Sequence, residues 1–544
     1  MRPFIIALTS FAFSVAAPAQ ERSAPPVAAA PLAPEAAAIK AHVMFLASDA
    51  MKGREAGSTE YDIAAEYVAA QFFAAGLKPG AKDGGYLQPV PLVSFTSVGG
   101  GKLSLTRGGS VTPLIFGTDY LPVATPGAKT IDLAAPVVFV GHGIVAPHLK
   151  RDDYAGVDAK GKIVAYLAGA PAGMSGEERA YLGSPDTKAK AAAAHGAVGA
   201  ITLYTPEAEK MRPFARAVEA FPGNRMTWAN PDGSAHVEDR VPTLATLSVA
   251  GAAKLFAGGR LTWATVAKEA AKPAPRWRGE QLPVTLSIAT ETSFAPARSS
   301  NVVGVLPGSD PALSKEVVIL SAHLDHIGEA KKGEDRINNG ALDNAIGIAS
   351  LIEESKRFRA AGAPKRTILF LAVTAEEKGL IGSDYFARHP TVPLTSIVAD
   401  VNLDMPILTY TFEDMVAFGG DRSSLGPIIR RAVEGAGLAL SPDPIPAEGI
   451  FVRSDHFRFV QQGVPSVFLW PGQKGPGQTA VTHFLGTNYH RPSDDLKQPI
   501  LWDQGVRFVD VNYRIAREIA DAPTRPLWNK GDYFAGQFGG PTMP

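Results

Sequence analysis

Acidic and imidazole side chains follow short apolar runs in the second half of this 544-residue chain. Such runs predict buried strands, and α/β proteins bind ligands where their strands end. One His or Asp at a strand end is usually a cap or a solvated loop residue, but five groups in one half of a chain indicate a shared site. The groups are His323-Leu-Asp325-His326, Asp343-Asn344, Glu376-Glu377, Asn402-Leu-Asp404 and Asn488-Tyr489-His490.

These residue types favour a metal centre built without thiolates. The chain contains no cysteine, which excludes disulfides, thiolate zinc sites, iron–sulfur clusters and cysteine nucleophiles. Two imidazoles and three carboxylates are enough to hold two zinc ions when one carboxylate bridges them. A spare carboxylate beside the ligands can then move protons during hydrolysis.

Alternating strands and helices must position these groups. Apolar runs predict strands over 317–320, 367–373, 396–401 and 465–470. Periodic apolar residues predict helices over 345–358, 379–388, 425–433 and 501–519. The alternation predicts an α/β fold with a mostly parallel mixed sheet flanked by helices.

The rest of the chain divides around this catalytic part. Short strands and turns over 98–280 predict a β-rich inserted module, which ends near a Pro-rich stretch. A helical pattern opens the segment before it. The expected order after the first residues is an amino-terminal catalytic part (37–97), the insert (98–280), the main catalytic part (285–522) and a tail (523–544).

The first nineteen residues predict an export signal. Arg2 precedes an almost wholly apolar stretch, and Ala17-Pro-Ala19 has the small-x-small pattern of a cleavage site; an uncleaved anchor is the alternative. No later run reaches 18 apolar residues, so we expect an exported protein, periplasmic or secreted, without a membrane span in its mature chain. Lys plus Arg and Asp plus Glu both number 53, and this balance gives no reason to expect nucleic acid as a partner.

Three other enzyme classes fail on their motifs. Gly141-His-Gly143 follows an apolar run, but Pro147 blocks the helix that a dinucleotide site needs. No Gly-x-Ser-x-Gly elbow for a serine hydrolase is present. None of the 11 His residues is followed by Glu, which excludes the His-Glu-x-x-His zinc motif.

The order and spacing of the strand-end groups resemble the secreted di-zinc exopeptidases that include bacterial leucyl aminopeptidase and glutamate carboxypeptidase. The resemblance implies two zinc ions per chain. It implies that His323 and Asp404 hold one zinc, that Glu377 and His490 hold the other, and that Asp343 bridges both.

The same resemblance assigns roles beside the metals. Glu376 is expected to be the general base, and Asp325 to hydrogen-bond His323 from behind. Tyr489 either contacts the oxyanion or substrate, or is a packing residue. We expect three nearby residues to lie outside the ligand set, namely His326, Asp455 and His456.

The middle module resembles the protease-associated domain inserted in larger members of that family, through Gly141-His-Gly143 and the stretch 152–164. It is expected to shape the substrate cleft without catalytic groups, so His142, His148 and His195 are interpreted as ordinary residues. The sequence thus predicts a zinc metallo-exopeptidase acting on peptides, most simply an aminopeptidase. A carboxypeptidase or dipeptidase, a glutaminyl cyclase-like enzyme and a non-catalytic receptor-like relative are the alternatives.

Overall fold

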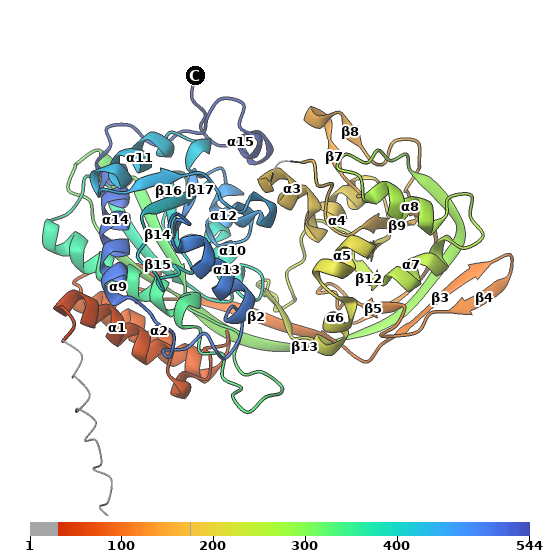
Figure 1. Ribbon diagram of the computed structural model, residues 1–544, viewed down its shortest axis with the longest axis horizontal. Helices are drawn as coiled ribbons and strands as arrows, with labels where there is room; N and C mark the ends of the chain where they lie inside the picture. Colours follow the sequence, from red (N-terminus) through yellow and green to blue (C-terminus); the bar gives the residue numbers. More distant parts are fainter. Residues whose placement is uncertain (1–30, 175) are drawn as a thin grey trace, which may run out of the picture.

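The computed structural model describes residues 31–174 and 176–544, so the expected export signal over 1–19 lies outside the described residues. The chain forms two lobes that share one long strand, β13 (Glu280–Leu306) (Figure 1). One lobe holds the amino-terminal helices and the carboxy-terminal half of the chain. The other, the insert lobe, holds most of the residues between β2 and β13. Within the described ranges, no helix is both long and apolar enough to cross a membrane.

A mixed sheet forms the centre of the first lobe, the catalytic lobe. Its strand order is β11-β2-β13-β15-β14-β16-β19-β17-β18. The central strands β15, β14, β16 and β19 are parallel, which confirms the predicted α/β class. The strands are β1 (Lys78–Pro79, paired with β13), β2 (Leu87–Ser97), β11 (Arg225–Trp228), β14 (Val317–His323), β15 (Thr367–Val373), β16 (Ile397–Leu403), β17 (Asp414–Phe418), β18 (Ala439–Ser441) and β19 (Ser466–Pro471).

Helices cover both faces of this sheet, and this explains why its strands are continuous apolar runs. Leu320 and Phe370 point to one face and join the core of α1, α2, α9, α11 and α14. Ile319 points to the other face and packs with Phe386 of α10 and Phe459 of α12. The helices are α1 (Pro34–Leu46), α2 (Thr59–Ala74), α9 (Ile346–Ala361), α10 (Ile381–Arg388), α11 (Leu425–Gly435), α12 (His456–Val460), α13 (Gly477–Thr487), α14 (Trp502–Asp521) and α15 (Tyr533–Phe538).

The insert lobe has its own sheet and core. The strand order is β4-β3-β13-β6-β9-β10-β12-β5, and β6, β9, β10 and β12 are parallel neighbours. Its core contains Phe139, Leu167, Leu203 and Phe256. The elements are β3 (Lys102–Arg107), β4 (Ser110–Pro113), β5 (Tyr120–Pro122), β6 (Thr130–Phe139), β7 (Val145–Ala146), β8 (Arg151–Asp152), β9 (Ile163–Leu167), α3 (Gly176–Gly183), α4 (Pro185–Ala194), β10 (Gly199–Leu203), α5 (Pro206–Met211), α6 (Phe214–Ala220), β12 (Thr243–Leu247), α7 (Val249–Phe256) and α8 (Trp263–Ala270).

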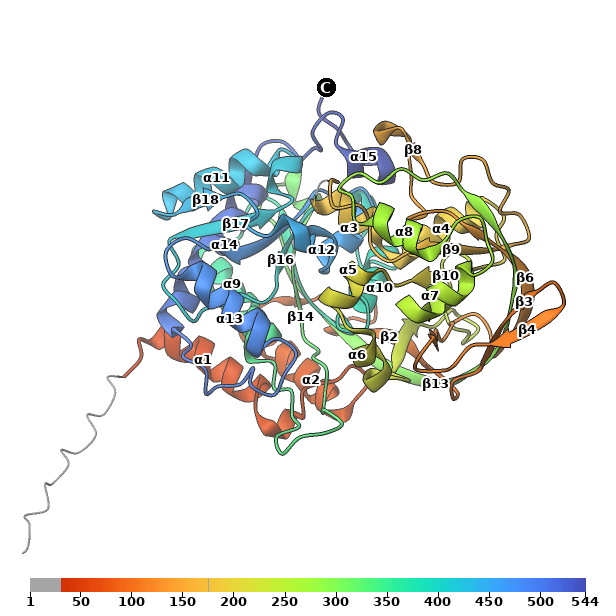
Figure 2. The same ribbon diagram turned by 45° about the vertical axis from the view of Figure 1, so that its right-hand side comes forward.

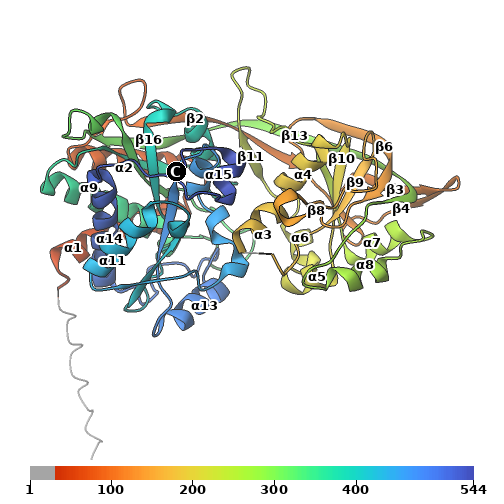
Figure 3. The same ribbon diagram turned by 90° about the horizontal axis from the view of Figure 1, so that it is seen from above.

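β13 belongs to both sheets. Its first part, up to Glu291, pairs with β6 and β3, and its later part pairs with β2 and β15. The change from insert to catalytic part that we expected at 280–285 therefore falls inside a strand. Pro283 lies where the register with β6 shifts, a position that tolerates a residue without an N–H. Seen from above, the strand links the two lobes along one edge of the molecule (Figure 3).

The lobes also meet at α3. Helix α3 lies near α12 and α15 (Figure 2). Tyr181 of α3 packs against Phe457 of α12 and against Phe534 of α15. Arg422 donates to Glu177 of α3 and to Asp532, and so joins the insert to the residues expected as a tail. Within 523–544, Trp528 and Phe534 are buried in the core of the catalytic lobe. The carboxy-terminal segment is thus a packed part of the interface between the lobes.

Candidate metal centre

The loops at the carboxyl ends of the parallel strands bring the predicted residues together. His323 is the last residue of β14, Glu376 and Glu377 follow β15, and Asp404 follows β16. Asp343 lies in the turn Ala341–Ala345 that begins α9. The last group does not follow a strand of the sheet. His490 lies in the loop after α13 and has a positive φ of 56°.

Five ligand-type side chains form two sets that share Asp343. Nε2 of His323 is 3.0 Å from Oδ1 of Asp404 and 3.3 Å from Oδ1 of Asp343. Nε2 of His490 is 3.0 Å from Oε2 of Glu377 and 3.3 Å from Oδ2 of Asp343. Each oxygen of Asp343 therefore faces a different imidazole–carboxylate pair.

The donor set fits zinc, and its unsatisfied atoms call for a cation. Oδ2 of Asp343 and Oε1 of Glu377 are buried and receive no well-directed hydrogen bond from the described residues, although an imidazole nitrogen lies 3.3 Å from the first and 2.8 Å from the second. Burying an unpaired carboxylate oxygen is unfavourable by several kcal/mol unless a positive charge faces it. Imidazole nitrogen and carboxylate oxygen are the ligands that zinc takes when thiolates are absent.

Burial and mutual pairing shift the pKa values within the two sets. Burial opposes charge on His323, but Asp404 and other carboxylates outweigh it and hold the pKa of His323 well above its ordinary value. For His490, burial again opposes charge, but the neighbouring carboxylates of Asp343 and Glu377 outweigh it and raise the pKa to about 10. Burial raises the pKa of Glu377, but the neighbouring imidazoles bring it down to about 2. The imidazoles and carboxylates of the two sets thus stabilise each other's charges.

Glu376 lies beside the ligands without joining either set. Its backbone N–H donates to Oδ1 of Asp325 at 3.0 Å, and that of Glu377 donates to Oδ2 of Asp325 at 3.3 Å. Burial raises the pKa of the Glu376 carboxyl well above its ordinary value. A carboxyl of raised pKa next to two metal-binding sets is suited to exchanging protons.

Asp325 differs from its predicted contact. Nδ1 of His323 donates to the backbone carbonyl of Asp325 at 3.1 Å, while the Asp325 carboxylate accepts from the Glu376–Glu377 backbone. The carbonyl therefore fixes the ring of His323, which leaves Nε2 toward the carboxylates. The carboxylate instead links the β14 loop to the β15 loop.

Two polar residues brace the ligands from behind. Ser454 donates to Oδ2 of Asp404 at 2.6 Å, which leaves Oδ1 toward His323. Sequence reasoning missed Ser454, although it precedes the Asp455–His456 pair that we placed near the cleft. The carboxylate of Asp494 accepts the backbone N–H groups of Leu342 and Asp343, both at 3.0 Å.

The remaining predicted residues surround the centre. Tyr489 stacks on His490 with ring centroids 3.8 Å apart, and burial raises the pKa of its hydroxyl. Nδ1 of His326 is 2.8 Å from Oε1 of Glu377, so His326 is close enough to share that set. Asp455 accepts from Ser383 at 2.6 Å.

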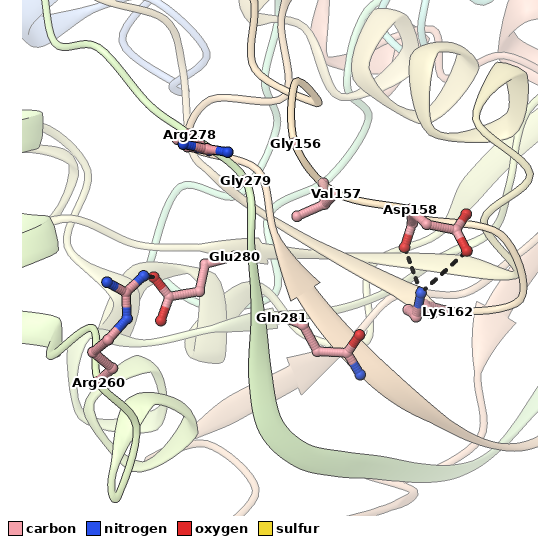
Figure 4. Close-up of a pocket in the computed structure, with 9 residues that line it drawn as sticks. All are labelled: Gly156, Val157, Asp158, Lys162, Arg260, Arg278, Gly279, Glu280 and Gln281. Carbon is pink, nitrogen blue, oxygen red and sulfur yellow. Dashed lines mark hydrogen bonds and ion pairs between the residues drawn. The ribbon is translucent and has the colours of Figure 1, made fainter.

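A surface pocket of the insert lobe lacks such convergence. It has a volume of about 540 Å³ and lies beside the start of β13 (Figure 4). Lys162 pairs with Asp158, and Arg260 donates to Glu280 at 2.8 Å. Four of its five charged side chains thus pair with one another in the wall of the pocket.

Comparison with known proteins agrees with this geometry. Residues 301–516 match the model of peptidase family M28. Probable leucine aminopeptidase 2 of Aspergillus oryzae is 30% identical over 216 residues, which is 36% of this chain and 40% of that protein. A protein of the same name from Aspergillus fumigatus is 27% identical over 231 residues, 39% of this chain and 43% of that protein. The chain thus spans less than half the length of these curated relatives.

A solved structure extends the likeness in fold to most of the chain. The aminopeptidase from Aneurinibacillus sp. strain AM-1 has a TM-score of 0.50 at 19% identity, covering 94% of this chain and 98% of that chain. This likeness concerns the fold of both lobes. The matched residues 301–516 contain both ligand sets, whose imidazole and carboxylate donors fit zinc, so over this range the chain resembles the zinc metallopeptidases of family M28.

Proposed function

We propose that the protein is a two-zinc exopeptidase and acts as an aminopeptidase. The observation that carries the proposal is the position of the Asp343 carboxylate between the two sets: its two oxygens each lie 3.3 Å from a different imidazole. A carboxylate shared in this way can hold two metal ions a few ångströms apart. The curated relatives named as leucine aminopeptidases favour the amino end of the substrate.

In the proposed reaction this chain's residues hold ligands and move one proton. Zinc, when bound, supplies Lewis acidity for the scissile carbonyl and the attacking water. Glu376 takes the proton of that water on a carboxylate oxygen and gives it to the leaving amine as the C–N bond breaks. Asp325 fixes the direction of Glu376 through the backbone, and Ser454 holds Asp404 in place.

A carboxypeptidase or dipeptidase is the second candidate, because a cation lies near the centre. Arg453 precedes Ser454, and its guanidinium pairs with Glu448 at 3.1 Å. A guanidinium is the group that best recognises a terminal carboxylate. In an aminopeptidase Arg453 serves only to hold Glu448.

We propose that the insert shapes access to the centre and supplies no catalytic group. Its helix α3 packs against the segment that contains Phe457, just after Ser454. Arg422 ties α3 to the carboxy-terminal segment through Glu177 and Asp532. A protease-associated type of module in this position would limit the length of peptides that enter.

Three small substrates separate the candidates. Aminoacyl anilides with a free amine test for an aminopeptidase, the same anilides acetylated on the amine are the matched control, and N-blocked dipeptides test for a carboxypeptidase. We expect hydrolysis of the free-amine anilides alone, two zinc ions per chain by elemental analysis, loss of turnover on chelation and recovery with zinc. Release of the carboxy-terminal residue from blocked dipeptides would favour the second candidate. A zinc-saturated chain that cleaves none of the three would contradict both the aminopeptidase and the carboxypeptidase.

A further inference from the structure

Arg54 is a buried cation close to the metal centre that neither the ligand sets nor the proposed reaction uses. It lies in the loop between α1 and α2, has a φ of 45°, and exposes 1% of its surface. Burying a guanidinium is costly unless every donor finds a partner. The position of Arg54 in so confined a place calls for an explanation.

The guanidinium donates to backbone carbonyls of three separate segments. Nε donates to Leu324 at 3.0 Å, and Nη2 donates to Gly340 at 3.1 Å. Nη1 donates to Leu46 at the end of α1 and to Asn339, both at 2.6 Å. In the described ranges, no carboxylate lies within ion-pair distance of Arg54; the centre's acidic groups, Asp325 and Asp343 among them, oppose the loss of its charge on burial.

Two of these segments carry metal ligands. Leu324 directly follows His323, and Gly340 lies three residues before Asp343. One planar group therefore fixes the distance between the backbone after β14 and the backbone that enters the Asp343 turn. His323 and Asp343 are the pair whose 3.3 Å separation sets up the first metal position.

The rest of the loop strengthens this link. The backbone N–H of His326 donates to the carbonyl of Arg54 at 3.2 Å, and that of Gly328 donates to Gly53 at 3.1 Å. A Cβ at Gly53 would lie 2.5 Å from the carbonyl of Asn338, so the two backbones are in direct contact. The side chain of Asn339 donates to the carbonyl of Ala47 at 3.0 Å, which connects the segment before Asp343 to the end of α1.

We propose that Arg54 is a positioning residue of the metal centre, and that its planar fork holds His323 and Asp343 at the spacing that zinc requires. The inference rests on the proposed two-zinc function. A lysine keeps the charge but is a single point donor, and it cannot span the carbonyls of Leu324 and Gly340. The proposed role therefore depends on the shape of the guanidinium and not on its charge.

The test compares Arg54→Lys and Arg54→Met with Asn339→Ala, which loosens the same loop without changing charge. Zinc dissociation constants are measured by competition with a chelator, and kcat and KM at saturating zinc. We expect both Arg54 variants to bind zinc on the order of 10- to 100-fold more weakly, as loss of an outer-shell support does. Asn339→Ala should weaken zinc less, and kcat should fall more than KM changes.

Arg366 provides a matched control. It is equally buried and donates to the carbonyls of Ile519 and Ala522, but it precedes β15 at the end opposite the metal centre, about 20 Å away along the strand. Arg366→Lys should lower stability and leave the zinc dissociation constant unchanged. Equal zinc loss in the Arg54 and Arg366 variants would overturn the inference about Arg54 but not the proposed function. An Arg54→Lys variant that binds zinc like the parent would do the same. A parent chain that binds no zinc would overturn the proposed function as well.

Discussion

The two lobes bury the same kinds of ionisable side chains and arrange them in opposite ways. In the insert lobe, His142, Asp153 and Lys188 each have their own hydrogen-bond partners. Nδ1 of His142 accepts from Trp277 at 3.1 Å, Asp153 accepts two backbone N–H groups, and Lys188 donates to two backbone carbonyls. Burial lowers the pKa of His142 to about 2 and keeps its ring neutral.

In the catalytic lobe, the buried groups face one another. The Asp343 carboxylate lies 3.3 Å from each of two imidazoles, and one of its oxygens has no hydrogen-bond partner in the part of the chain that the structure describes. Burial of a His or Asp is thus a poor indicator of function. Convergence of several buried groups with unsatisfied atoms is the better one, and the following experiments test that distinction.

Asp343→Ala should have the largest effect. Because both proposed metal positions share this carboxylate, we expect the variant to lose both zinc ions and to fall to background turnover. The measurement is zinc stoichiometry by elemental analysis, together with anilide hydrolysis. Asp153→Asn is the control, a buried carboxylate of the insert lobe whose loss should leave two zinc ions. An Asp343→Ala chain that keeps both ions would remove the bridge from the proposal.

The adjacent pair Glu376 and Glu377 should separate proton transfer from metal binding. Glu376→Gln keeps its shape but cannot take a proton, so it should retain two zinc ions and lose turnover by ~10²–10⁴. Glu377→Gln should instead weaken the metal that it shares with His490, because Oε2 is 3.0 Å from that imidazole. Zinc content and kcat are measured for both variants side by side.

The outcomes of that pair are distinct. Added zinc should restore part of the activity of Glu377→Gln and none of the activity of Glu376→Gln. Metal loss in Glu376→Gln with retention in Glu377→Gln would reverse the two roles. Full activity in Glu376→Gln would contradict the proposed mechanism.

The regular part of the fold follows from the sequence because strands buried on both faces are continuous apolar runs. The predicted runs at 317–320 and 367–373 are β14 and β15, and their ends carry His323 and Glu376. The shared strand β13 was not predictable, because Pro283 favours a boundary and only the pairing with β6 shows that a register shift accommodates it.

Contacts across long sequence separations account for the other differences. Arg54 meets Gly340 across 286 residues, and nothing in the local pattern of the amino-terminal loop indicates that partner. Asp325 was expected to contact His323 through its carboxylate. A residue two positions after a strand end presents both its carbonyl and its side chain, and the sequence does not say which one turns back. Here the carboxylate accepts hydrogen bonds from the backbone N–H groups of Glu376 and Glu377.

Lys188 should give the insert lobe a distinct dependence of stability on pH. Burial lowers the pKa of Lys188 from 10.5 to about 7, while the amine still donates to two carbonyls. Between pH 7 and 10 the unfolded chain binds a proton that the folded chain does not, so the free energy of unfolding should rise with pH, by at most about 1.4 kcal/mol per unit. Denaturant unfolding at several pH values, compared with Lys188→Met, measures this rise.

Lys190 lies on the same helix and controls for the loss of a charge from α4. It is half-exposed and pairs with Glu238 at 3.0 Å. Lys190→Met should leave the rise with pH as in the parent, whereas Lys188→Met should remove it. If the parent and Lys188→Met show the same rise, the buried amine does not titrate as its surroundings require.

The smallest effect on catalysis should come from His142, and it tests the contrast between the lobes most directly. His142 and His323 are both buried, at 4% and 1% exposure. His142→Asn removes the ring but keeps an amide oxygen that can accept from the Trp277 indole N–H, so the cost in stability should be at most about 1 kcal/mol. Turnover of a small anilide should stay within a few-fold of the parent, with two zinc ions bound, whereas His323→Asn should lose one ion and nearly all turnover. Both variants are first confirmed as folded by circular dichroism. A folded His142→Asn chain that loses turnover a hundred-fold would place part of the catalytic machinery in the insert. A His323→Asn chain that keeps its turnover would show that convergence of buried groups does not mark the active site of this protein.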